Sequence, residues 1–130
     1  FLTLSSKLSG TYLNAQQVAQ KFKNKVKVFD TLSISLGISL MAVTALDLTE
    51  KGYSYDEILL KLERKRDGSI LFFSVPTLKY LIRGGRVGKI QGIIGSLLHL
   101  KLLMALEDGL VVKKGTSLTE KGEGFYIYPI

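Results

Sequence analysis

The sequence predicts an α/β fold in which a parallel sheet with flanking helices is followed by a C-terminal β-hairpin. Two runs rich in apolar and β-branched residues, 26–29 and 69–75, have the length and composition of buried strands. The segments between them repeat apolar residues with the period of a helix, and strands joined by helical crossovers are parallel in nearly all α/β proteins. Glu107, Asp108 and Gly109 form a strong hairpin turn signal between two further apolar runs.

The first helix is expected from Gly10 to about Asn24, and a short buried strand at 26–29 should end in Asp30. A second helix is predicted over 35–51, with Gly52 as its C-terminal stop. The uncharged run 31–46 is too short and too rich in Ser and Thr to cross a bilayer, which needs roughly 20 mostly apolar residues. It is therefore predicted to be a buried helix.

Ser54 and Glu57 have the spacing of a capping box, so a third helix should begin there and end near Gly68. The following run, 69–75, is predicted to be an interior strand, and Pro76 suits the first turn of the next helix. That helix should stop at Gly84 and Gly85, two glycines that can adopt left-handed conformations.

The character of the chain changes after Arg86. Residues 89–98 are predicted to form a short helix broken by glycine, and 99–106 with 110–114 to form the antiparallel hairpin. The tail beyond Gly115 is expected to be poorly ordered.

Composition excludes several classes of site. The 130 residues include no cysteine, which excludes disulfides and thiolate metal sites, and the single His99 lies in an apolar run where a strand residue is expected rather than a catalytic base. The segment 84–89 lacks the glycine and lysine spacing of a phosphate loop, and no pair of carboxylates with opposed environments is found. The sequence therefore predicts a binding protein and not an enzyme, without cofactor or metal.

Two segments are candidates for an anion site. Ser9, Gly10 and Thr11 stand directly before the first helix, where hydroxyls cap unpaired N–H groups and where the same donors can receive an anionic ligand. Gly84 and Gly85 are followed by Arg86, whose planar guanidinium fits a carboxylate or phosphate. Ordinary helix capping is the alternative for both segments.

Held together, these segments resemble the DegV family of bacterial fatty-acid-binding proteins, the carrier subunits of fatty-acid kinase. The resemblance covers nearly all of positions 3–114 in order and spacing, which is about half of a typical family member. It is carried by the segments 5–12, 26–37, 71–87 and 94–109.

The resemblance implies an α/β ligand-binding domain at 1–88, incomplete at its N-terminus, and the start of a second, truncated α+β domain at 89–130. It implies that a long-chain fatty acid such as palmitate or oleate lies in an apolar cavity, with its carboxylate at Ser9, Gly10, Thr11 and Arg86. The protein would be cytoplasmic and would present this carboxylate to the catalytic subunit of a fatty-acid kinase for phospholipid synthesis.

Two alternatives stay open. One is a basic module that binds nucleic acid or an acidic protein, because the net charge is +7 and basic clusters lie at 21–27 and 61–66. A solvated helix face is the favoured interpretation of these clusters, and no nucleic acid is expected. The other alternative is a fragment without activity of its own, because the chain begins at Phe1 and lacks both ends of the family pattern. An open cavity would then leave Phe72, Phe73, Leu98 or Leu100 exposed and promote self-association.

Overall fold

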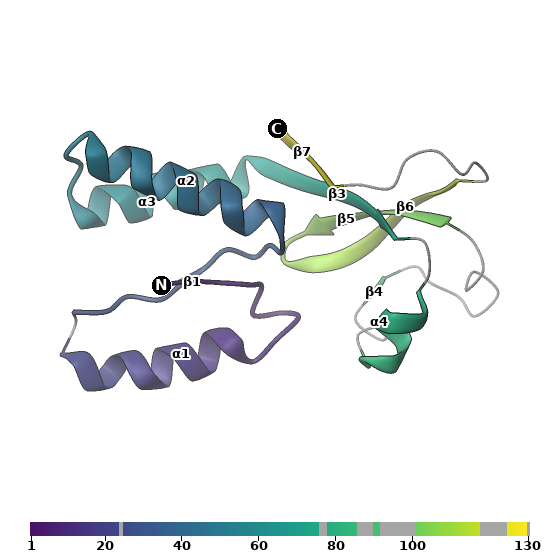
Figure 1. Ribbon diagram of the computed structural model, residues 1–130, viewed down its shortest axis with the longest axis horizontal. Helices are drawn as coiled ribbons and strands as arrows, with labels where there is room; N and C mark the ends of the chain where they lie inside the picture. The colour runs from purple at the N-terminus through teal and green to yellow at the C-terminus, as the bar shows by residue number, and fades with distance from the viewer. Residues whose placement is uncertain (24, 76–77, 86–89, 92–100, 118–124, 130) are drawn as a thin grey trace.

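In the computed structural model of the protein, residues 1–23, 25–75, 78–85, 90–91, 101–117 and 125–129 are described, and they form a mixed α/β fold (Figure 1). The elements, in chain order, are β1 (Leu2–Thr3), α1 (Thr11–Ala19), the 3-10 helix η1 (Gln20–Phe22), β2 (Phe29–Asp30), α2 (Leu36–Glu50), α3 (Tyr55–Asp67), β3 (Ser69–Val75), α4 (Lys79–Arg83), β4 (Ile90–Gln91), β5 (Lys101–Glu107), β6 (Leu110–Ser117) and β7 (Phe125–Pro129).

The first layer is a parallel pair of short strands between helices. β1 pairs with β2 in the register Leu2 to Phe29 and Thr3 to Asp30. α1 lies on one side of this pair, and α2 and α3 lie together on the other (Figure 1). The predicted parallel sheet with flanking helices is therefore confirmed.

Helix α3 begins at the capping box that its sequence predicts. The Glu57 N–H donates to Ser54 Oγ, and Glu57 Oε2 accepts from the Ser54 N–H at 2.8 Å. These contacts satisfy donors that the first turn leaves unpaired, and they hold the pKa of the exposed Glu57 below its ordinary value, chiefly through the Ser54 hydroxyl.

Helix α2 differs from the buried helix that its uncharged sequence predicts. Met41 and Leu48 are buried on the side of the strands and α3, whereas Val43 and Leu46 are each 65% exposed. Within the part of the chain that the structure describes, α2 therefore has one buried side and one side with exposed apolar residues. Among the described residues, no helix is long and apolar enough to cross a membrane.

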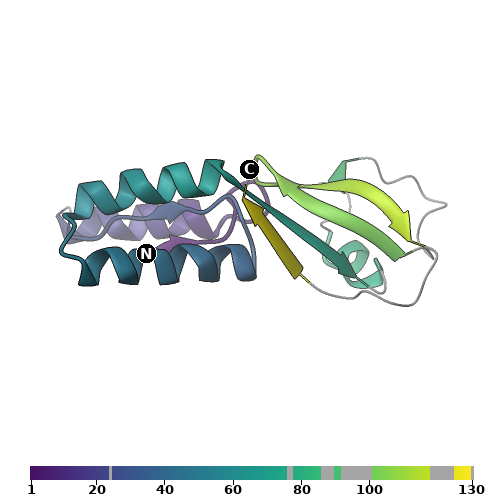
Figure 2. The ribbon, with the colours of Figure 1, turned by 90° about the horizontal axis from the view of Figure 1, so that it is seen from above.

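Strand β3 lies in a second sheet of five strands, in the order β4-β6-β5-β3-β7. It spans the predicted residues, but it pairs antiparallel with β5 and β7 instead of joining β1 and β2 in parallel. Seen from above, β3 leaves the end of α3 and crosses into the other half of the molecule (Figure 2). The prediction that it belongs to the first sheet was wrong, because strand length and composition do not specify the partner strands.

The hairpin between β5 and β6 turns at Asp108 and Gly109, as predicted. Both residues have positive φ, 48° and 78°, which is the conformation of a two-residue hairpin turn. The same sheet overturns two expectations, because Ile90–Gln91 is strand β4 and not helix, and the tail segment 125–129 is strand β7 paired with β3. The predicted domain boundary at 88/89 stays a prediction, and the second sheet has strands on both sides of it.

Two hydrophobic clusters hold these layers together. The smaller joins Phe29, Met41 and Leu62, and the larger packs the second sheet against Leu8 and Leu78. Phe73 is only 4% exposed and belongs to the larger cluster, so the expectation that it lies at an open surface was wrong. Phe72 is half-buried, and Leu98 and Leu100 lie outside the described residues. Exposed apolar side chains are found on α1 and α2, and also at Leu60 of α3, Tyr80 of α4 and Leu103 of β5.

Candidate functional site

Two polar loops meet where the parallel strands β1 and β2 end. The Asp30 carboxylate accepts the backbone N–H groups of Ser6, at 3.2 and 3.3 Å, and of Leu32, at 3.0 Å. The Ser5 N–H donates to the Ser33 carbonyl at 2.9 Å. Because the carboxyl ends of parallel strands meet at one edge, this contact network fixes the loop that leads into α1.

The tip of the β5–β6 hairpin is seated on the first of these loops. Ser5 is fully buried, and its hydroxyl donates to the Gly109 carbonyl at 2.6 Å. A side chain at Gly109 would place its Cβ 2.6 Å from Ser5 Oγ and 2.9 Å from the Leu32 side chain, and φ at this position is already +78°. Glycine is therefore required here by both space and conformation.

Backbone strain accompanies this arrangement. Leu32 and Ser35, neither of them glycine, have φ of 47° between β2 and α2. Residues in such conformations persist where the surrounding contacts over-determine them, and they cluster at ligand and switch sites. The second loop is thus held in an unfavourable shape by the network around Asp30.

The predicted hydroxyl residues Ser9 and Thr11 lie together at the start of α1. Their side-chain oxygens are 2.8 Å apart, and the Thr11 N–H donates to Ser9 Oγ at 3.2 Å. The helix begins after Gly10 without a side-chain cap on its second or third N–H group. Ser9 therefore fixes the entry into the helix, and both hydroxyls are within reach of a group at its positive end.

Gly10 is exposed and has ordinary backbone angles, φ −72° and ψ 0°. A Cβ at this position would meet no atom within 4 Å. The fold itself does not require glycine here. The absent side chain leaves open space in front of the first turn of α1.

An apolar groove of about 480 Å³ begins at this helix start and follows α1 toward its other end. Its volume is within the range of about 300–1,000 Å³ that small-molecule sites occupy. None of the nine residues of α1 is buried, although Leu13 and Val18 are apolar. The groove is lined by Phe1, Thr11, Asn14, Ala15, Val18, Ala19, Phe22, Val26 and Val28.

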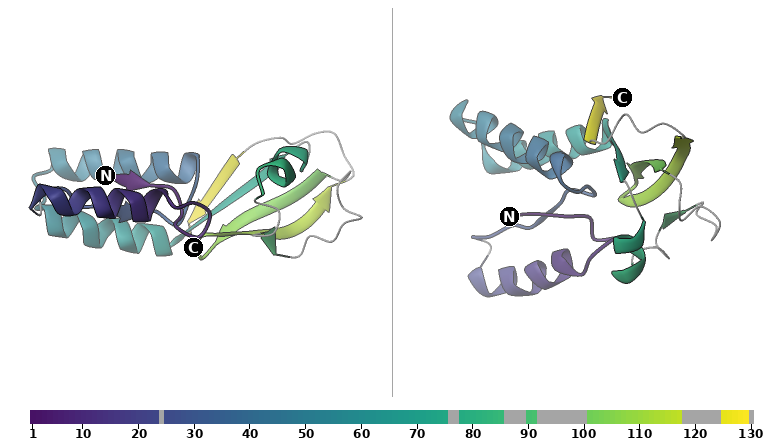
Figure 3. Two further views of the ribbon diagram at one scale, coloured as in Figure 1. Left: turned by 90° about the horizontal axis from the view of Figure 1, so that it is seen from below. Right: turned by 45° about the vertical axis from the view of Figure 1, so that its right-hand side comes forward.

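Arg86 lies outside the described residues, so the structure places only the segment that leads to it. Helix α4 ends at Arg83, and Gly85 takes the predicted left-handed conformation with φ 72°. Leu8 and Leu78 share one hydrophobic cluster, which brings the start of α4 beside the loop that leads into α1. The right-hand view of Figure 3 shows α4 close to this loop. The convergence of Arg86 with Ser9 stays a prediction.

A second cavity, of about 300 Å³, lies on the α2–α3 side of the same strand ends, and its lining includes Thr31, Ser33 and Arg66. The Arg66 guanidinium donates from Nη1 to the Asp30 carbonyl at 3.3 Å and from Nε to Asp67 at 2.8 Å, and it stacks on the Phe29 ring. The sequence prediction treated Arg66 as part of a solvated basic face. Arg66 stands directly before Asp67 and Gly68, where α3 ends, and this position in the sequence could have indicated its structural role.

The position of the groove along α1 was also not predicted from the sequence. The apolar residues that α1 contributes to it repeat with the helical period of a face that packs on other elements. Nothing in the period distinguishes a helix face that packs on protein from one that faces a groove. Among the described residues, no cluster of His, Cys, Asp or Glu is suitable for a metal ion.

Comparison with known proteins gives a consistent result. The family model described as "Uncharacterised protein, DegV family" matches residues 1–124. A DegV domain-containing protein of Staphylococcus aureus (strain COL) is 41% identical over 106 residues, which are 82% of this chain and 38% of that protein. A fatty acid-binding protein of Thermotoga maritima is 40% identical over 114 residues, 85% of this chain and 39% of that protein.

Among solved structures, one described as fatty acid binding of a DegV family protein from Thermus thermophilus is similar with a TM-score of 0.83 and 43% identity. The match covers 92% of this chain and 44% of that one. The chain thus spans about two fifths of the length of the curated relatives it matches.

Proposed function

The chain belongs to the DegV family, and from this premise we propose that it holds a long-chain fatty acid, with the acyl chain in the α1 groove and the carboxylate at Ser9, Gly10 and Thr11. The observation that carries the proposal is the groove itself. It is apolar along α1 and ends at the Ser9–Thr11 hydroxyl pair. An amphipathic ligand with one anionic end matches this polarity.

The acyl chain would supply most of the binding free energy. Each buried methylene contributes about 0.8 kcal/mol, so a chain of about 12 methylenes contributes at most about 10 kcal/mol before the entropic cost of binding. The groove runs from Thr11 to Phe22, and a rise of about 1.5 Å per residue gives it a length of about 16 Å. An extended hydrocarbon advances about 1.3 Å per methylene, given C–C bonds of about 1.5 Å. The groove therefore accommodates about 12 methylenes, which with the carboxyl and methyl carbons corresponds to an acyl chain of about 14 carbons.

The carboxylate requires paired donors, because an ionised group loses several kcal/mol on burial unless it is hydrogen-bonded. The hydroxyls of Ser9 and Thr11 and the uncapped N–H groups of the first turn are donors of this kind. Gly10 leaves room for the carboxylate to approach the backbone. Arg86, which follows α4 in the sequence, would contribute the positive charge that the family resemblance implies.

Two related proteins support this assignment by their descriptions, since those from Thermus thermophilus and Thermotoga maritima are described as binding fatty acid. In the full proposal, the protein is a cytoplasmic accessory subunit that performs no phosphoryl transfer. It presents the carboxylate to a separate fatty-acid kinase, which forms an acyl phosphate for phospholipid synthesis.

The binding proposal is tested with a fluorescent long-chain fatty acid and two tryptophan variants of α1. Ala15 lines the groove, whereas Gln17 lies on the same helix outside its lining. Ala15→Trp should fill the groove and weaken binding at least ten-fold, which corresponds to a loss of about 1.4 kcal/mol of binding free energy. Gln17→Trp should leave the affinity within two-fold. Equal affinity of both variants, with unchanged folding, would refute the groove as the acyl site.

The carboxylate end is tested by comparing a fatty acid with the alcohol of the same chain length. Thr11→Val removes a hydroxyl while it keeps the shape of the side chain. A hydrogen bond to a charged group contributes about 1.5–3 kcal/mol, so the preference of the protein for acid over alcohol should fall roughly 10- to 150-fold. An unchanged preference would assign Thr11 to helix entry alone. Native mass spectrometry of the purified chain would identify any lipid that it retains.

A further inference from the structure

Helix α2 has an exposed apolar stripe on the side that is turned away from the rest of the protein. Leu36 is 45% exposed, and Val43 and Leu46 are each 65% exposed. At about 100° per residue, these three side chains and Ser39 lie within an arc of about 80°, opposite the buried side of the helix. Positions 36, 39, 43 and 46 are spaced alternately by three and four residues, which is the spacing of the seam between two packed helices.

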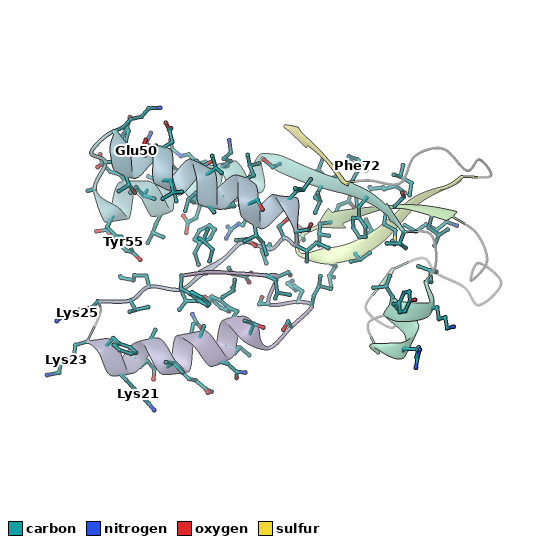
Figure 4. The ribbon with its side chains drawn as sticks, in the orientation of Figure 1. Lys21, Lys23, Lys25, Glu50, Tyr55 and Phe72 are labelled. Atoms are coloured by element: carbon teal, nitrogen blue, oxygen red, sulfur yellow. The ribbon has the colours of Figure 1, made fainter. Side chains whose placement is uncertain are left out.

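The charges of α2 are confined to one end of this stripe. The run 31–46 contains no charged residue, whereas Asp47 and Glu50 lie in the last turn. Asp47 pairs with Lys51 at 2.8 Å, but no ion pair within the described part of the chain involves Glu50. Figure 4 shows Glu50 at the end of α2, at the outer limit of the molecule.

The other end of α2 has the opposite electrostatic character. Its first turn contains no acidic residue, and Ser35 makes no side-chain cap there. The N–H groups of a first turn and the helix dipole together favour a negative charge at this end. The apolar stripe therefore lies between a positive end and a negative end of the same helix.

We propose that this stripe is a dimer interface, on which α2 of a second copy of the chain packs antiparallel. A two-fold interface brings the same surface of both copies together, so the surface must be complementary to itself. With the axis midway between Ser39 and Val43, Leu36 meets Leu46 of the second copy, and Val43 meets the small Ser39 of the second copy. Every exposed apolar side chain of the stripe is then covered, and large side chains face apolar or small ones.

The same register brings the oppositely charged ends of the two helices together. Glu50 extends past Leu36 of the second copy and lies beside the first turn of its α2, where a carboxylate is favoured. A parallel arrangement would instead place Glu50 next to Glu50 of the second copy. Charge complementarity therefore selects the antiparallel orientation.

A lipid surface is another apolar occupant for an exposed helix face, and the charges of α2 argue against it. Helices that lie on anionic lipid have Lys or Arg beside the apolar face. The stripe of α2 is followed by Asp47 and Glu50, and the one basic residue beside them, Lys51, is paired with Asp47. A second copy of the chain fits both the apolar and the charged parts of α2.

The proposed interface is small and leaves the α1 groove free. A helix of 15 residues is about 22 Å long, and one pair of such helices buries less area than a permanent complex. The dimer is therefore reversible and depends on protein concentration. Because α1 lies on the other side of the strands from α2 (Figure 1), the grooves of both copies stay open in the dimer.

The test is sedimentation equilibrium of the chain from about 5 to about 500 µM, the range in which small interfaces associate. The wild type should change from monomer to dimer across this range. Leu46→Gln should raise the dissociation constant at least about 25-fold, because a truncated central side chain costs about five-fold or more and each copy loses one. Leu60→Gln is the matched control, since Leu60 is a 49% exposed leucine of α3 outside the stripe, and it should leave the constant unchanged.

Glu50→Gln tests the orientation of the two helices. In the antiparallel dimer it should raise the dissociation constant roughly 3- to 30-fold, because a carboxylate at a helix N-terminus contributes about two- to five-fold and two are lost. In a parallel dimer the same change removes a repulsion and lowers the constant. Tighter association of Glu50→Gln would therefore overturn the proposed arrangement.

Three other outcomes would also overturn the inference. One is a chain that stays monomeric at the highest concentration, and another is an equal effect of Leu46→Gln and Leu60→Gln. The third is loss of the dimer in Val18→Gln but not in Leu46→Gln, because Val18 lines the α1 groove and the chains would then associate through that face. Melting temperatures establish that each variant is folded, and the substituted side chains are exposed, so none is expected to lower the melting temperature.

Discussion

Replacing Ser5 with alanine tests whether one buried hydroxyl holds the hairpin tip against the first layer. Ser5 Oγ donates to the Gly109 carbonyl at 2.6 Å and accepts the Lys7 N–H at 3.2 Å. Alanine removes both contacts at a position that is 0% exposed. A buried polar group left without its partner costs about 1–3 kcal/mol, and the Lys7 N–H is only partly buried, so the expected loss is about 2–3 kcal/mol.

Urea unfolding measures this loss directly. With a slope of about 1–3 kcal/mol per molar urea, the midpoint should fall by roughly 1–2 M at an unchanged slope. Ser6→Ala is the matched control, because Ser6 contacts Asp30 through its backbone N–H, which alanine keeps. Equal midpoints for the two variants would refute the assignment of this stability to the Ser5 hydroxyl.

Three further predictions concern single positions. Gly37→Ala would place a Cβ 1.8 Å from Ser33 Oγ and should lower the melting temperature, and adding Ser33→Gly should restore part of the loss. The hydrogen bonds from Ser54 lower the pKa of Glu57 below its ordinary value of 4.5. The stability that Glu57 adds is therefore present above pH 4.5 and is lost as the pH falls through the lower pKa of the folded state. Melting curves of the wild type and Glu57→Gln should converge in acid. Arg86→Ala should weaken fatty-acid binding roughly 10- to 150-fold, the equivalent of a charged hydrogen bond, while the melting temperature stays unchanged.

Local signals predicted the elements of this fold well. The capping box at Ser54 and the turn at Asp108 and Gly109 each specify a backbone conformation within four residues, and the structure has both. The strand at 69–75 was predicted with its correct bounds, but its neighbours were not. Its paired residues lie 27 to 60 positions later in the chain, in segments whose composition does not specify which strand they join.

In the candidate site too, local features were predicted from the sequence and contacts between distant segments were not. Ser9 and Thr11 were selected as hydroxyls before a helix, and the structure brings their oxygens together. The apolar face of α1 was predicted from its period, yet the period predicts only that the face is covered, not by what. The strained Leu32 could not be predicted, because its φ of 47° is imposed by contacts with loops from other parts of the chain.

The open face of α1 has a consequence for the rate at which its amide protons exchange with solvent. A helix of nine residues is marginal in water by itself, and this one gains no buried side chain from the protein. Its amides should therefore exchange quickly in the ligand-free chain, while those of the α3 turn around Leu62 exchange slowly. An acyl chain beside α1 would provide the missing apolar contact, so slowed deuterium uptake in this one helix would report when the groove is filled.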